Sequence, residues 1–146
     1  MDFGVVTGLI SLGKVTKMLE IVKQIGETIQ QNVRGVQVAY SKIPTSVADL
    51  KALVSIRLGK ITPIDETSAG VPYKFRYDFR VEVWTRQDNI LLWYDIADQV
   101  VNALHLQTFL EGFTSLMLND LTFLEYRGEY VYGYMDFVCF KIGEKI

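Results

Sequence analysis

The sequence has few of the residues that carry metal binding and nucleophilic catalysis. Among its 146 residues there is one cysteine, Cys139, and one histidine, His105. A single cysteine excludes an internal disulfide framework and a cysteine-based zinc cage, and a single histidine excludes a multi-histidine metal site. No Gly-x-Ser-x-Gly nucleophile motif is present. We therefore expect no catalytic residues, no metal and no cofactor, and we interpret the chain as a protein that is not an enzyme.

Long hydrophobic runs are also missing. No stretch reaches the roughly 18 consecutive apolar residues of a membrane helix. The apolar segment 3–12 follows Asp2 and precedes Lys14, which is not the charge order of a signal peptide. We therefore expect a soluble protein that is made in the cytoplasm and has no membrane partner.

Two short patterns have both a chemical and a plain structural interpretation. Gly8 and Gly13-Lys14 have the spacing of a phosphate-binding loop, but Val15 stands where a hydroxyl residue should bind Mg²⁺. We do not expect nucleotide binding there. Asp95 and Asp98 lie three residues apart on a predicted helix. They fit an acid–base pair or a Mg²⁺ site, but carboxylates at this spacing more often form a solvated helix face.

Three single residues also admit a plain interpretation. His105 follows a predicted helix, where the helix dipole alone favours it. Cys139 lies in a predicted strand and fits a small buried hydrophobe. Asp136 interrupts an apolar strand, and we favour an ion pair with Arg76 or Arg80 across the sheet over a polar contact in a subunit interface.

The composition is that of a globular protein with an uneven charge distribution. Apolar residues make up 49% of the chain, charged residues 22% and aromatic residues 12%. The net charge is −2, but residues 1–86 carry 12 basic and 8 acidic residues (+4), and residues 87–146 carry 3 basic and 9 acidic residues (−6). A polarised subunit can pack head to tail with its next copy, or each half can solvate its own surface.

Hydrophobic periodicity predicts a single domain, 1–146, with a short N-terminal arm at about 1–13. Steps of three and four predict helices at 14–33 and from Asp88 or Asn89 to Leu104, and alternation predicts strands. The strands are expected at 50–61, 73–85, 121–126 and 130–142, with a short β-type run at 36–40 and a long loop at 62–72. Segment 105–120 fits a helical stripe but is short. We predict an α+β fold with an about four-stranded, mostly antiparallel sheet and two main helices packed on one face.

The order of these elements resembles the tail terminator proteins of tailed bacteriophages and the related tail-completion and head–tail joining proteins. The resemblance covers about Val15 to Ile142. It rests on an amphipathic helix that leads into two strands with a long loop, on the strand 75–85 followed directly by Asp88-Asn89 and a helix, and on the long closing strand 133–140.

The resemblance implies a structural virion protein that forms a six-membered ring. Such a ring caps the head-proximal end of the tail tube, stops tube polymerisation and joins the tail to the head connector. The implied partners are further copies of the chain, the tail tube protein and the connector, and genomic DNA passes through the lumen without specific binding. We expect interface residues in the 62–72 loop and in the aromatic hairpin with its neighbouring strand: Ile64, Asp65, Glu66, Val71, Trp84, Tyr130, Tyr132 and Tyr134.

Two alternatives stay open. A neck protein of similar fold would bind the head portal complex instead of the tube. A small α+β enzyme or ligand-binding module would need a concave polar pocket.

Overall fold

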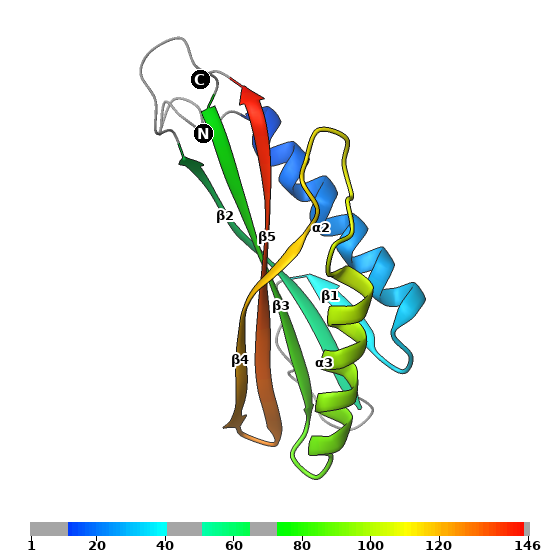
Figure 1. The fold of residues 1–146 in the computed structure, drawn as a ribbon. Coiled ribbons are helices and arrows are strands. Elements are labelled where there is room, and N and C mark those ends of the chain that lie inside the picture. Colours follow the sequence, from blue (N-terminus) through cyan, green and yellow to red (C-terminus); the bar gives the residue numbers. More distant parts are fainter. Residues whose placement is uncertain (1–11, 41–50, 65–72, 145–146) are drawn as a thin grey trace.

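The computed structural model describes residues 12–40, 51–64 and 73–144 (Figure 1). These residues form two helices and five strands, in the order α2 (Leu12–Asn32), β1 (Gln37–Tyr40), β2 (Ala52–Ile64), β3 (Tyr73–Arg86), α3 (Ile90–Leu104), β4 (Met117–Arg127) and β5 (Tyr130–Glu144). Residues 1–11 of the predicted N-terminal arm lie outside the described residues.

The strands form one sheet in the order β1-β2-β3-β5-β4. β1 runs parallel to β2, and the other three neighbouring pairs are antiparallel. The expected sheet of about four mostly antiparallel strands is therefore wrong: the described sheet has five strands and is mixed, although the fold class is α+β. The direction of β1 depends on how the chain returns to β2, and a four-residue pattern carries no information about that return.

The two helices pack against one face of the sheet, which we call the helix face (Figure 1). On β3 this face consists of residues that alternate along the strand and are at most 1% exposed: Phe75, Tyr77, Phe79, Val81 and Val83. A stripe of buried α2 residues at helical spacing meets them, and Val33, just after the helix, continues it; the α2 residues are Met18, the adjacent pair Ile21 and Val22, Ile25 and Ile29. This apolar layer is the main core of the protein.

Helix α3 begins and is anchored through two local contacts. The side chain of Asn89 accepts a hydrogen bond from the backbone N–H of Leu92 at 3.3 Å, which confirms the predicted N-cap. Farther along, the indole Nε1–H of Trp93 donates to the carbonyl of Val83 on β3 at 2.9 Å. The helix is thereby fixed to the strand that immediately precedes it.

The ambiguous segment before β4 is irregular. Residues 105–116 contain no helix, and β4 begins at Met117, four residues earlier than predicted. Leu106 and Gly112 have positive φ values of 68° and 85°, which a helix does not allow. The apparent helical stripe arises because Phe113 and Leu116 are buried in the core from an irregular backbone.

Candidate interface on the open face of the sheet

The second face of the sheet, which we call the open face, carries the polar half of the β3 alternation. On β3 it consists of Lys74, Arg76, Asp78, Arg80, Glu82 and Trp84, with the partners that the register places beside them on β2, β5 and β4. Two regions can be distinguished along it. One is an aromatic cluster, and the other is a charged hollow.

The aromatic cluster contains four of the eight predicted interface residues. Trp84, Tyr130 and Tyr132 pack with Ala39 and Leu53 in a second hydrophobic cluster, and Tyr134 packs against it. The ring centroids of Trp84 and Tyr132 are 4.4 Å apart, and those of Tyr132 and Tyr134 are 5.9 Å apart. Trp84 is only 4% exposed, whereas Tyr134 is half-buried. These rings therefore have partners within their own chain, and their contact with another subunit stays a prediction.

A buried polar network joins this cluster to the charged residues. The hydroxyl of Tyr132 donates to Glu82 Oε2 at 2.8 Å, and Arg57 Nε lies 2.7 Å from the same oxygen. Burial, followed by the hydrogen bond to Glu82, raises the pKa of Tyr132, so its hydroxyl stays protonated and remains the donor. Glu82 itself is 4% exposed.

A row of four charged residues crosses the sheet next to this network. The register places Arg57 opposite Arg80, Arg80 opposite Asp136, and Asp136 opposite Asp120. Arg80 binds Asp136 through two hydrogen bonds, of 2.9 and 3.2 Å, and its guanidinium lies 3.7 Å from the ring centre of Tyr134. This confirms the favoured prediction that Asp136 pairs across the sheet, and it selects Arg80 as the partner.

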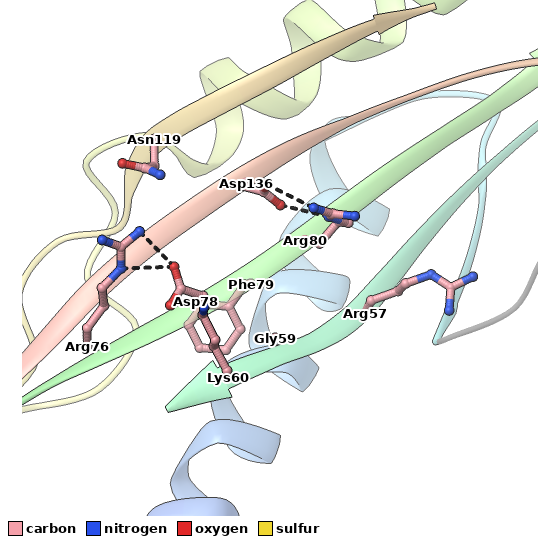
Figure 2. A pocket seen from close by; sticks show the side chains of 9 residues that line it. All are labelled: Arg57, Gly59, Lys60, Arg76, Asp78, Phe79, Arg80, Asn119 and Asp136. Atoms are coloured by element: carbon pink, nitrogen blue, oxygen red, sulfur yellow. Dashed lines mark hydrogen bonds and ion pairs between the residues drawn. The ribbon is translucent and has the colours of Figure 1, made fainter. Parts of the chain in front are cut away.

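The charged hollow is bordered by Arg57, Arg80 and Asp136 of this row and has a volume of about 510 Å³ (Figure 2). Two bulges flank it at the same level of the sheet: the register of β2 shifts between Leu58 and Ile61, and that of β4 between Leu118 and Asp120. The residues within these shifts, Gly59-Lys60 and Asn119, all line the hollow. The full lining is Arg57, Gly59, Lys60, Arg76, Asp78, Phe79, Arg80, Asn119 and Asp136.

Glycine is required at the β2 bulge because the strands approach closely there. A Cβ atom on Gly59 would overlap the backbone carbonyl of Asp78. The carboxylate of Asp78 binds Arg76 through Oδ1 at 2.9 Å, while its buried Oδ2 has no hydrogen-bond partner among the described residues. The side chains of Arg76 and Asp78 point toward each other at one end of the hollow (Figure 2). The sequence indicated the charges of β3 but not the bulges, since Gly59 fits the β2 alternation.

Of the remaining predicted interface residues, the structure describes Ile64 alone. Ile64 is the last residue of β2, half-buried and opposite Lys74, while Asp65, Glu66 and Val71 lie outside the described residues. His105 Nδ1 accepts a hydrogen bond from the backbone N–H of Leu118 at 3.2 Å. Ile64 and His105 are not among the residues that line the charged hollow.

Cys139 is buried on the helix face, as expected for a small hydrophobe. Burial raises the pKa of its thiol to about 12. In the part of the chain that the structure describes, no group of three or more His, Cys, Asp or Glu side chains could hold a metal ion. None of the described helices is long and apolar enough to cross a membrane.

Comparison with known proteins finds similar folds among solved structures. No protein-family model and no curated protein matches the sequence. One similar solved chain, whose name states no function, has a TM-score of 0.57 at 10% identity, with 90% of this chain and 97% of that chain covered. Another comes from the virion of a native gene transfer agent particle, with a TM-score of 0.51 at 16% identity and coverage of 88% and 92%. At these identities the likeness shows a shared fold.

Proposed function

We propose that the chain is a non-enzymatic structural protein of a phage-like virion. More specifically, we propose that it forms a six-membered ring at the head-proximal end of a tail tube, where it stops polymerisation of the tube and joins the tail to the head connector. The observation that carries the proposal is the fold shared with a chain of a gene transfer agent virion over 88% of this chain and 92% of that one. The element order that resembles tail terminators supports the finer assignment.

The open face supplies the kind of surface that such an assembly needs. It combines the half-buried ring of Tyr134, which stacks on Arg80, with a hollow lined by both signs of charge. Aromatic side chains and arginine are enriched at protein interfaces, and complementary charges fix register and partner choice. A ring subunit uses such features on two different patches, because each copy contacts two neighbours.

Light scattering over a concentration series, with electron microscopy of the same samples, tests the ring. Six copies of 16.7 kDa amount to about 100 kDa, and we expect particles of this mass with a central hole. Added to purified tail tubes, the protein should co-sediment and appear at one end of each tube. A protein that neither forms rings nor binds tubes would contradict the proposal, and binding to a head portal complex instead of tubes would assign the chain to the neck.

A pair of tyrosine variants tests whether the open face takes part. Tyr134→Ala removes a ring from this face. Tyr126→Ala removes an exposed tyrosine of β4 that lies opposite Val131, a residue of the helix face. We expect Tyr134→Ala to weaken ring or tube binding and Tyr126→Ala to leave it unchanged. Equal effects of the two changes would remove the open face from the interface.

A further inference from the structure

Helix α3 presents an acidic stripe to solvent. Its outward residues follow helical spacing and are all exposed: Leu91, Tyr94, Asp95, Asp98 and Asn102. No lysine or arginine occurs in α3. Among the described residues, the hydrogen-bond partners of Asp95 and Asp98 are the neutral amides of Gln99 and Asn102, at 2.9 and 3.5 Å. Neither of these partners is a basic side chain.

The same stripe begins with two large apolar side chains that have little cover. Leu91 is 82% exposed and Tyr94 is 48% exposed. An apolar end next to two carboxylates is typical of a contact region in which hydrophobic area supplies affinity and charge supplies orientation. We call residues 91, 94, 95, 98 and 102 the acidic stripe.

The charged hollow has the complementary character. Four of its lining residues are cationic, Arg57, Lys60, Arg76 and Arg80, and two are anionic, Asp78 and Asp136, which leaves a net charge of +2. Lys60 is exposed and forms no ion pair with another described residue. The acidic stripe carries a net charge of −2, from Asp95 and Asp98.

The lengths of the two surfaces also agree. Leu91 and Asp98 are seven residues apart on a helix, which corresponds to about 10 Å. On β5, Tyr134 is two residues from Asp136, which lines the hollow, and four residues from Val138, which lies opposite Asp78 of the hollow, so the hollow begins about 7–13 Å from Tyr134. A helix that places Asp98 at the hollow would therefore bring Leu91 to the level of the Tyr134 ring.

The two surfaces face in opposite directions. α3 covers the helix face, whereas the hollow lies on the open face (Figures 1 and 2). The acidic stripe of one molecule therefore cannot reach its own hollow. It can reach the hollow of another copy.

We propose that the occupant of the charged hollow is the acidic stripe of a second copy of this chain. The inference rests on the proposed function and names the two surfaces that would join neighbouring subunits. Asp95 and Asp98 of one copy lie against Lys60 and Arg76 of the next, and Leu91 and Tyr94 lie against the neighbouring aromatic cluster. Because the two patches differ, the contact is head to tail, and its repetition closes a ring or continues as a filament.

Charge reversal with cross-complementation tests this contact. The stripe variant carries Asp95→Lys and Asp98→Lys, and the hollow variant carries Lys60→Glu and Arg76→Glu. Each variant by itself places like charges opposite each other in the contact. We therefore expect the Kd of subunit association to rise about a hundred-fold. An equimolar mixture restores both types of contact in alternation, so assemblies should return, and a chain with all four changes should assemble by itself.

Matched reversals on α2 control for the altered net charge. Glu20→Lys with Glu27→Lys changes the net charge by the same amount as the stripe variant, at exposed positions of α2. Lys17→Glu with Lys23→Glu does the same for the hollow variant. These controls should assemble like the wild type. Circular dichroism of every variant verifies that the monomers remain folded.

The outcomes separate this inference from the proposed function. If each variant alone still formed rings, or if the equimolar mixture formed none, the proposed contact would be wrong. Ring formation by the wild type would remain established in both cases. A wild type that stays monomeric up to about 1 mM, a concentration that detects even weak association, would also overturn the proposed contact. Tube binding by that monomer would still support the proposed function.

Discussion

Gly133 on β5 lies close to both Trp93 of helix α3 and Thr122 of β4, and this leaves no room for a side chain. It belongs to the helix face of β5, opposite Val83. A Cβ atom at this position would overlap the Trp93 ring and lie 2.8 Å from the backbone carbonyl of Thr122. Trp93 cannot move aside easily, because it is 1% exposed and its indole N–H is bonded to Val83. Gly133→Ala should therefore displace the ring that anchors α3.

The expected cost follows from two terms. Forcing an extra methyl group into a packed core costs about 1–3 kcal/mol, and losing the Trp93 hydrogen bond costs about 0.5–1.5 kcal/mol. Together they predict a loss of about 2–4 kcal/mol in the free energy of unfolding. For a chain of this size, that loss lowers Tm by about 5–15 °C. Urea unfolding followed by circular dichroism measures the difference without relying on tryptophan fluorescence.

A double-mutant cycle assigns this cost to the contact with Trp93. Trp93→Phe removes the outer ring atoms that the new Cβ would overlap, so Gly133→Ala should cost about 1–2 kcal/mol less in that background. Gly128→Ala is the control: a Cβ there meets no atom within 4 Å, and only the φ of 60° disfavours alanine. Its cost should not change with Trp93→Phe. If the cost of Gly133→Ala were also the same in both backgrounds, the packing of α3 on β5 would differ from the one described.

Two further predictions concern single groups. The pKa of Cys139 is raised from 9.0 to about 12, so at pH 8 its thiolate fraction is about a thousand-fold lower than in the unfolded chain, and iodoacetamide should modify it far faster in urea than in buffer. Because the unfolded chain ionises first, this group should lower stability as the pH rises from about 9 to about 12; equal alkylation rates would contradict its burial. Asn89→Ala removes the N-cap of α3 and should cost about 1 kcal/mol in urea unfolding. Asn89→Asp should retain most of that stability, and equal losses would show that the cap does not act through its side-chain oxygen.

Hydrophobic periodicity in the sequence predicted those helices and strands that bury one side against the main core. The alternation along β3 and the helical stripe of α2 both follow from burial on one side, so their pattern is present in the sequence itself. The Asn89 cap was also predictable, because its hydrogen bond is local. Segment 105–116 was not, since Phe113 and Leu116 are buried by an irregular backbone at helix-like spacing.

The charged hollow depends on long-range register, which a single sequence does not reveal. β3 showed that Arg76, Asp78 and Arg80 share a face, and the pairing of Asp136 with Arg80 was among the predicted alternatives. The bulges at Gly59-Lys60 and Asn119 were missed because each arises from a mismatch between two strands rather than from a pattern within one strand. The aromatic residues were recognised as a group, but their packing against Leu53 on another strand was not.

The charged row has a layout that the fold alone does not require. The Arg80–Asp136 pair is partly exposed, and after screening by solvent such a pair contributes only about 0–1 kcal/mol to stability. Against this gain stand two like-charge neighbours, Arg57 beside Arg80 and Asp120 beside Asp136, which are unfavourable at directly opposed positions. Ion pairing along this row therefore contributes little net stability, while the helix face holds the core that maintains the fold. Residues that segregate positive and negative charge on a solvent-facing sheet without stabilising it are suited to recognition. Lys60 and Arg76 lie outside this row, and Arg76 pairs with Asp78, so circular dichroism must confirm that their reversal changes assembly and not folding.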